Sequence, residues 1–283
     1  MFANAERYLD LALEGRNEWW RYLLGVATVA FFWLVLGYVP YILLQRAGLT
    51  EPPFDFVAIN LSIFVMLAGL AVAVKLIHGR SLRSLVTPAD RIDWARVARG
   101  AAVWAMLAIA AAAMEHVLYP GRYYLSFDPG RFPAFLALVL ALTPMQSAVE
   151  ELVFRGYVMQ GLGLLTRRPL AIAVLSSLAF TAPHLLNPEV QEHGAIIMAA
   201  NYFVIGMLLA SVTLREGRLE LAIGLHAANN VFLALIANYE GSALTTESVF
   251  TARELDPAYS LATLIVGAVV FHWWIFRRAP ANT

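Results

Sequence analysis

Three short groups of polar residues, each next to or within a hydrophobic stretch, could carry chemistry. They are Glu-Glu-Leu-Val-Phe-Arg at 150–155, Phe-Thr-Ala-Pro-His at 180–184 and His-Ala-Ala-Asn-Asn at 226–230. A carboxylate and an imidazole held at one point can share a water molecule and remove its proton. A second imidazole and an amide can donate hydrogen bonds to a developing oxyanion. These residue types indicate hydrolysis of a carbonyl compound, and the carbonyls available in a membrane are those of peptides and lipid esters.

The first group contains two carboxylates that a helix would separate. Glu151 and Arg155 are spaced i, i+4, so they would pair on one helix face. Glu150 points about 100° away from that face and lacks this partner. We therefore expect Glu151 and Arg155 to form a structural pair and Glu150 to be the reactive carboxylate. The alternative is that all three are solvated charges at the cytoplasmic interface.

The other two groups place a histidine and a second residue on one helix face. Phe180 and His184 are four residues apart, and Pro183 can kink their helix, so the alternative for His184 is a buried histidine bonded to a freed carbonyl. His226 and Asn230 are also four residues apart and face the same way. Their alternative is a set of hydrogen bonds that join two membrane helices.

The composition indicates the class of protein that must position these residues. Of 283 residues, 60% are hydrophobic and 14% are charged, whereas soluble domains carry about 25% charged residues. The 20 basic and 20 acidic residues cancel, so no net field favours a nucleic acid or another polyanion. The absence of cysteine excludes a disulfide scaffold, a thiolate metal site and a cysteine nucleophile. A polytopic membrane protein remains.

Eight hydrophobic stretches predict an all-α fold class, a polytopic transmembrane helix bundle of about eight spans. Residues 4–18 carry too many acidic residues for a signal peptide; they suit an amphipathic helix at the membrane interface, with a solvated helix as the alternative. We expect an N-terminal part at 1–131 with this interfacial helix and three spans, a catalytic four-helix core at 132–237, and an outer loop with the last span at 238–283. The predicted spans are 22–44, 56–76, 97–118, 132–149 with a continuation, 169–186, 195–214, 219–237 and 259–276.

The basic residues predict the orientation of the bundle. With eight spans, both termini lie on one side, and only Arg46, Arg122, Arg131 and Arg253 of the 20 basic residues fall on the opposite side. Positively charged loops stay in the cytoplasm. We therefore expect both termini in the cytoplasm, in the plasma membrane of a bacterium or archaeon.

Helix geometry predicts that the three polar groups meet. Glu150 and His184 each lie about 22 Å along their helices from the turn at 166–168, at 1.5 Å per residue. His226 lies about 12 Å and Asn230 about 18 Å from the next turn, at 215–218. All four converge in the cytoplasmic half of the bundle if the first hairpin projects into the cytoplasm, with the site opening toward the cytoplasm. Since Asn187-Pro188 follows His184 so closely, the fifth span must be short or its outer loop must dip inward.

The ordered motifs Glu-Glu-x-x-x-Arg, Phe-x-x-x-His and His-x-x-x-Asn resemble those of the CPBP intramembrane proteases, the family of CAAX prenyl endopeptidases and bacteriocin-processing or immunity proteins. The resemblance covers about residues 132–230. It implies an eight-helix bundle and peptide-bond hydrolysis. It gives the water-activating role to Glu150 and His184, the oxyanion role to His226 and Asn230 (with Asn229 as the alternative amide), and a supporting role to Glu151, Arg155 and Phe180.

The resemblance also raises the question of a metal. Members of the family have been described both as metalloproteases and as glutamate-dependent enzymes without metal. Glu150, His184 and His226 could supply a zinc site with two histidines and one glutamate, but the sequence contains no H-E-x-x-H motif. We expect no metal cofactor, with this zinc set as the alternative. The expected partners are a peptide or membrane-anchored protein substrate and the lipid bilayer, with no nucleic acid.

Two other classes of function use the same residues. In a non-catalytic membrane scaffold or immunity factor, the motifs would be a structural network of polar contacts. A transporter or proton relay would also cluster glutamate and histidine within its spans, but the chain shows no repeated half and no paired broken helices. We therefore expect an intramembrane endopeptidase, with the scaffold as the main alternative.

Overall fold

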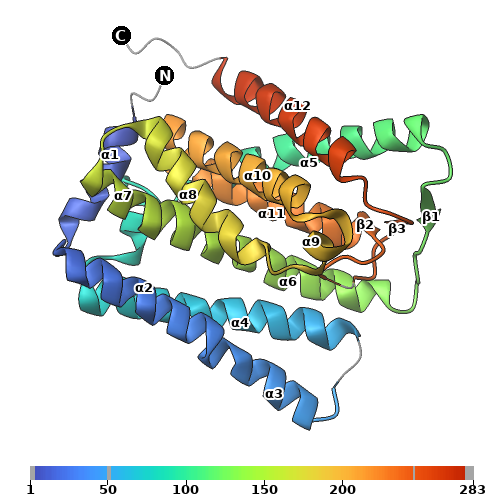
Figure 1. Ribbon diagram of the computed structural model, residues 1–283, viewed down its shortest axis with the longest axis horizontal. Helices are drawn as coiled ribbons and strands as arrows, with labels where there is room; N and C mark the ends of the chain where they lie inside the picture. Colours follow the sequence, from blue (N-terminus) through green and yellow to red (C-terminus); the bar gives the residue numbers. More distant parts are fainter. Residues whose placement is uncertain (1–3, 50–51, 245, 278–283) are drawn as a thin grey trace.

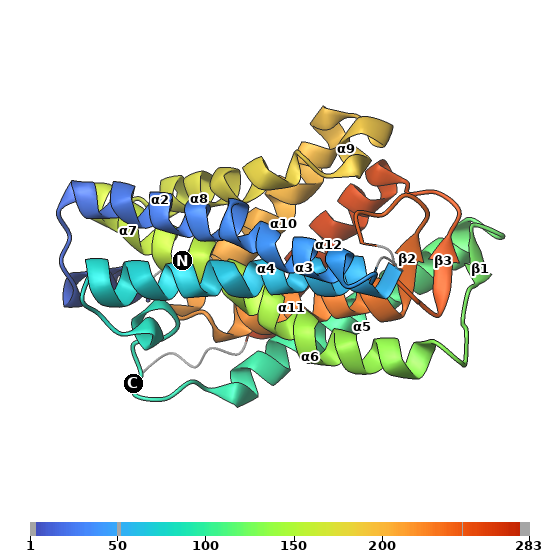
Figure 2. The same cartoon turned by 90° about the horizontal axis from the view of Figure 1, so that it is seen from below.

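The structure, a computed structural model, describes residues 4–49, 52–244 and 246–277, and its long helices form one bundle (Figures 1 and 2). In these residues, six helical stretches are long and apolar enough to span a membrane, and two shorter apolar helices accompany them. All eight stretches predicted to span the membrane are thus helical. The six long stretches are Trp19–Arg46, Phe54–Ile77, Trp94–Leu118, Phe132–Leu165, Ala195–Glu216 and Pro257–Phe276, and the two shorter helices are Pro169–His184 and Glu220–Leu235.

The first part of the chain forms a short N-terminal segment and three long helical stretches. Asp93 caps the third of these, because its carboxylate accepts hydrogen bonds from the backbone N–H groups of Ala95 and Arg96. The elements are α1 (Ala5–Leu9), a 3₁₀ turn (Asp10–Glu14), α2 (Trp19–Leu34), a 3₁₀ turn (Leu36–Tyr38), α3 (Val39–Arg46), α4 (Pro52–Val72), a π-helical turn (Ala73–Ile77), a 3₁₀ turn (Leu82–Leu85) and α5 (Trp94–Leu118).

The second part contains the three motifs. Proline starts several of its helices, since a first helical turn needs no backbone N–H from that residue. The elements are β1 (Tyr123–Leu125), α6 (Phe132–Glu151), a π-helical segment (Leu152–Val158), α7 (Met159–Leu165), α8 (Pro169–His184), α9 (Pro188–His193), α10 (Ala195–Glu216), α11 (Glu220–Leu235), β2 (Ala237–Tyr239), β3 (Phe250–Ala252) and α12 (Pro257–Phe276).

The N-terminal segment packs against the bundle. Tyr8 and Leu9 are buried together with Met159 and Ile172 of α7 and α8, and the Tyr8 hydroxyl donates a hydrogen bond to the Leu85 carbonyl at 2.6 Å. The sequence predicts an interfacial helix here. Tyr8, Leu9 and Leu11 are covered by protein, whereas Leu13 is exposed. The helix is also short, because it changes to a 3₁₀ turn after Leu9.

Close packing of small residues holds α11 against its neighbours. A Cβ atom on Gly224 would lie 1.9 Å from the Val97 carbonyl oxygen of α5, and one on Gly100 would lie 2.3 Å from the Leu221 carbonyl oxygen. Such glycines let two membrane helices approach closely. They fix the position of α11, which carries the third motif.

Three short strands join at one end of the bundle, which we call the strand end (Figure 1). In the order β1-β3-β2, β3 pairs antiparallel with β1 and parallel with β2. The rest of the described structure is mostly helical. The three strands depart from the all-α class that the sequence predicts. The opposite end, which we call the N-terminal end, contains α1, the end of α7 and the last turn of α12. Its connections carry many of the basic residues, while Arg278 lies outside the described residues.

Candidate active site

The first motif lies where α6 passes into the π-helical segment. Glu151 and Arg155 are fully buried and form the predicted ion pair, with 2.8 Å between Nη1 of Arg155 and Oε1 of Glu151. Arg155 also stacks on the Phe180 ring at 4.3 Å and donates a hydrogen bond to the Gly206 carbonyl. Glu150 is only 8% exposed. The alternative of solvated interfacial charges is therefore wrong, because all three side chains are buried in the bundle.

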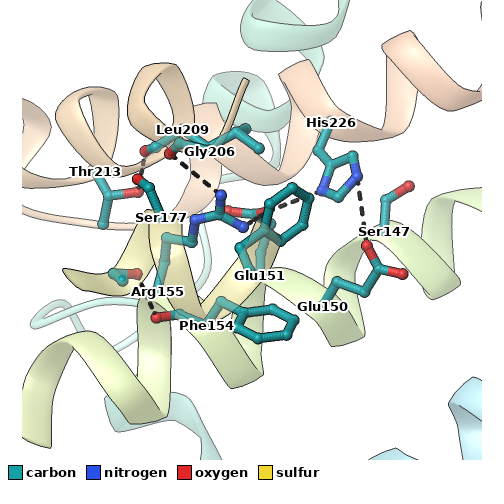
Figure 3. A network of polar contacts seen from close by, with 12 residues as sticks. Ser147, Glu150, Glu151, Phe154, Arg155, Ser177, Gly206, Leu209, Thr213 and His226 are labelled. Carbon is teal, nitrogen blue, oxygen red and sulfur yellow. Dashed lines mark hydrogen bonds and ion pairs between the residues drawn. The ribbon is translucent and has the colours of Figure 1, made fainter. Parts of the chain in front are cut away.

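His226 of α11 lies between the two carboxylates of α6 (Figure 3). Its Nδ1 is 2.8 Å from Oε1 of Glu151, and its Nε2 is 3.6 Å from Oε2 of Glu150. An ionised carboxylate can only accept a hydrogen bond, so Nδ1 of His226 carries a proton toward Glu151. Glu151 consequently contacts both Arg155 and His226, and it orients the imidazole as well as pairing with the guanidinium.

His184 of α8 is oriented in the same manner by a backbone group. Its Nδ1 lies 2.7 Å from the Phe180 carbonyl oxygen, and since a carbonyl only accepts, Nδ1 carries the proton and Nε2 keeps its lone pair. The ring also lies against Phe180 and Tyr202, with centroids 4.4 and 4.9 Å away. The structural alternative for His184 required a carbonyl freed by Pro183, which is that of Ala179, whereas Nδ1 bonds the Phe180 carbonyl. The other ring nitrogen is left available.

A directed chain of hydrogen bonds leads from α5 to Glu150. Nε1 of Trp104 donates to Oδ1 of Asn229 at 3.1 Å, and Nδ2 of Asn229 donates to Oδ1 of Asn230 at 3.1 Å. Nδ2 of Asn230 donates to Oε1 of Gln146 at 3.3 Å, and Nε2 of Gln146 donates to Oε1 of Glu150. Because an indole N–H can only donate, it sets the direction of every amide in the chain.

Sequence reasoning did not identify Trp104, Gln146 or Ser147, which accepts a second hydrogen bond from Asn230 at 3.2 Å. Gln146 could have been identified from its spacing, since it lies one helical turn before Glu150. Trp104 was harder to identify, because the only clue is an indole N–H at membrane depth that needs a hydrogen-bond partner. His226 and Asn230 do join α11 to α6 by hydrogen bonds, as their structural alternative requires, but this does not distinguish that alternative from a catalytic role.

A cavity of about 770 Å³ is lined by polar residues from each of the three motifs. Glu150, His184, His226 and Asn230 line it, and so do Asn229 and Tyr202. Glu150 and His184 make no direct hydrogen bond or ion pair within the described residues. They share the cavity without contacting each other.

The cavity extends toward the strand end. Its lining includes Tyr123 of β1, Tyr239 of β2 and Ala252 of β3, together with the first residues of α12. The distribution of basic residues predicts that the opposite end faces the cytoplasm. The cavity therefore does not support the prediction that the site opens toward the cytoplasm. The short fifth span expected beside Asn187-Pro188 is observed, because α8 ends at His184 after 16 residues.

A metal ion would need its ligands closer together than they are. Within residues 4–49, 52–244 and 246–277, no three His, Cys, Asp or Glu side chains form a group that could hold one ion. In this arrangement Glu150, His184 and His226 form no such group. The hydrogen bonds at the two Nδ1 atoms do not themselves oppose a metal, because metal-ligating histidines are commonly held in this way and bind through Nε2. The zinc set therefore stays the alternative to a site without metal.

Comparisons with known proteins agree with the motif resemblance. Residues 132–232 match the family model described as type II CAAX prenyl endopeptidase Rce1-like. The chain is also 29% identical to the uncharacterized protein YyaK of Bacillus subtilis, with 93% of this chain and 94% of that protein covered. No solved structure gives a significant match. The apolar helices and the family match indicate an integral membrane protein, and the match supports a protease.

Proposed function

We propose, from the premise that residues 132–232 match the Rce1-like prenyl endopeptidases, that this protein is an intramembrane endopeptidase. Its substrate is a peptide or membrane-anchored protein. One observation carries the proposal: Glu150 and two imidazoles oriented through Nδ1 line a single cavity within the bundle. A carboxylate beside two oriented imidazoles is an arrangement that can activate water.

In the proposed reaction, water lies between Glu150 and Nε2 of His184. The Glu150 carboxylate takes a proton from this water as its oxygen attacks the peptide carbonyl, and the proton then passes to the leaving amine. Asn230 donates a hydrogen bond to the oxyanion through Nδ2 in exchange for the one that it makes to Ser147. His226 can donate through Nε2 only as an imidazolium, because its other proton faces Glu151. No step passes through a metal ion.

A comparison of protein termini tests the proposed function. Membranes are prepared from cells that make the wild type or the Glu150→Gln variant at equal levels. The native N- and C-termini of their proteins are chemically labelled before the proteins are digested, and the labelled termini are identified by mass spectrometry. We expect a set of termini that occurs only with the wild type, which also identifies the substrate. Identical sets would instead favour the scaffold alternative, in which the same contacts between α6 and α11 only hold helices together.

The direction from which substrate arrives gives a second prediction. With the N-terminal end in the cytoplasm, the cavity leads to the outer face of the membrane. The chain has no cysteine, so a single introduced cysteine reports its own location. We expect Leu125→Cys, at an exposed position of β1, to react with a membrane-impermeant maleimide in intact cells.

The matched control for this labelling is Leu165→Cys. Leu165 is an exposed leucine at the end of α7, at the N-terminal end of the molecule. We expect it to react only after the cells are opened. The reverse pattern of labelling would contradict the proposed orientation and would place the mouth of the cavity in the cytoplasm.

The hydrogen-bond chain gives a third prediction. Trp104→Phe keeps an aromatic ring but removes the donor to Asn229, so the amides of Asn229 and Asn230 lose their fixed direction. Since one hydrogen bond contributes about 0.5–1.5 kcal/mol, we expect kcat to fall about 3- to 10-fold on the identified substrate, with KM little changed. Trp94→Phe, at an exposed position of the same helix, is the control and should retain the wild-type rate.

A further inference from the structure

The part of the cavity nearest the strand end is lined by acidic residues. Glu115, Glu189, Glu254 and Asp256 belong to the lining there, and Glu150 lies deeper. In the part of the chain that the structure describes, no lysine or arginine belongs to the lining. Low-dielectric walls strengthen the field of such charges. The described lining of the path to the candidate site therefore carries acidic side chains and no lysine or arginine.

One guanidinium compensates part of this charge from outside the lining. Nη1 of Arg122 lies 2.8 Å from Oε1 of Glu115, and its Nη2 lies 3.4 Å from Oδ2 of Asp256 and 4.0 Å from Oε1 of Glu254. Arg122 also stacks on Tyr119 at 4.1 Å, which fixes its position. Arg253 also lies at this end, over the Tyr124 ring at 5.1 Å, but among the described residues it forms no ion pair with these carboxylates. Three carboxylates therefore share one paired guanidinium before Glu189 is considered.

Glu189 differs from the other carboxylates because it is buried, being only 2% exposed. Its Oε1 accepts hydrogen bonds from the Tyr239 hydroxyl at 2.8 Å and from the Ala243 backbone N–H at 2.7 Å. Its Oε2 has no hydrogen-bond partner among the described residues. A buried carboxylate oxygen without a partner is costly. A cation that enters the cavity and displaces the atoms covering Oε2 would supply the missing partner.

We propose that the substrate carries a positive charge that pairs with Glu189 as it enters the cavity from the strand end. This inference rests on the proposed function, because it names the class of substrate that the endopeptidase takes. The cationic group is an ammonium or guanidinium, carried by a lysine or arginine side chain or by a free peptide amino terminus. Glu189 then selects the substrate, and Glu150 carries out the hydrolysis further along the same cavity.

The test measures binding, so that it does not depend on cleavage. The full-length Glu150→Gln protein is placed in phosphatidylcholine nanodiscs, whose lipids have no net charge. Three eight-residue peptides of leucine and alanine, each with a fluorophore at the C-terminus, serve as probes. The first is acetylated and contains two lysines, the second is acetylated and contains two glutamates, and the third is otherwise neutral with a free amino terminus.

We expect the lysine peptide, or the peptide with the free amino terminus, to bind about tenfold more tightly than the glutamate peptide, since like charges across an interface are repelled. The stronger binder of the two identifies the source of the cation. Adding Glu189→Gln should reduce this preference to about threefold or less, because the glutamine is neutral. Glutamine still accepts the hydrogen bonds from Tyr239 and Ala243 through Oε1, so the fold should be retained.

Glu192→Gln is the matched control, because Glu192 lies on the same short helix α9, is about half exposed and does not belong to the cavity lining. It should leave the preference unchanged. Equal affinities for all three peptides, including no binding of any, would overturn the inference, as would a preference that Glu189→Gln does not alter. The comparison of protein termini tests the proposed function independently of this binding experiment, because its result depends on Glu150 and not on the charge of a peptide probe.

Discussion

Replacing Glu150 by glutamine is expected to lower the rate of peptide hydrolysis by about 10²- to 10⁴-fold, the usual contribution of a positioned general base. The amide cannot take the proton from water. Glutamine has nearly the same shape, and its Oε1 can still accept the hydrogen bond from Gln146. The thermal unfolding midpoint should therefore remain that of the wild type. The purified full-length protein, assayed on the substrate found by the termini comparison, provides both measurements.

The neighbouring carboxylate is the matched control for this result. Glu151→Gln makes the same chemical change one residue later, but Glu151 is fully buried between Arg155 and His226. We expect this variant to lower the unfolding midpoint, because the buried guanidinium loses its counter-charge. Retained activity in the Glu150→Gln variant, or an equal loss of stability in both variants, would contradict the division of roles between the two glutamates.

Replacing Arg155 by methionine is expected to have the largest effect on stability. The variant leaves the Glu151 carboxylate buried without a cation, and it removes the stacking on Phe180 and the hydrogen bond to the Gly206 carbonyl. Breaking a buried ion pair by removing one partner costs about 3–5 kcal/mol. We expect most of the variant to aggregate during purification, and any folded fraction to unfold at a much lower temperature than the wild type.

Arg167→Met controls for the loss of a guanidinium as such. Arg167 is half exposed and pairs with Asp10 at 2.6 Å, and exposed ion pairs contribute about 0–1 kcal/mol. Size-exclusion chromatography after heating compares both variants in the same detergent. Equal midpoints for Arg155→Met and Arg167→Met would show that the buried pair does not hold the fold.

Much of the local structure could be predicted, because it depends on spacing within one helix. The Glu151–Arg155 pair follows from i, i+4 spacing, and the hydrophobic stretches coincide with helices. The short fifth helix follows from the position of His184 just before Asn187-Pro188. These features require only the rise and the periodicity of a helix.

Contacts between distant segments could not be predicted in the same way. Glu151 and His226 are 75 residues apart, and nothing in the sequence shows that the supposed structural carboxylate also orients the imidazole. The hydrogen bond from Trp104 to Asn229 joins two residues that are 125 positions apart in the sequence. Such contacts depend on how α5, α6 and α11 pack, and only the approach of α5 to α11 is set by their glycines Gly100 and Gly224.

The end of the bundle toward which the cavity extends could not be predicted from the sequence, for a different reason. Basic residues report which end of a helix lies in the cytoplasm, but they do not report at which end the helices enclose a space. That depends on the strands, which join segments before α6 and after α11. Three residues per strand are too few to give a readable alternation, so the sheet was not expected.

The π-helical segment at Leu152–Val158 rotates the end of the long helix relative to its beginning, because a π turn holds more residues than an α turn. Before it, Glu150 faces the cavity. After it, Gly163 faces the N-terminal segment so closely that a Cβ would lie 3.0 Å from Leu9. The side of the helix that faces the cavity is therefore rotated relative to the side that packs against the N-terminal segment. Without the π-helical segment, turning Glu150 toward the cavity would also turn Gly163 relative to Leu9.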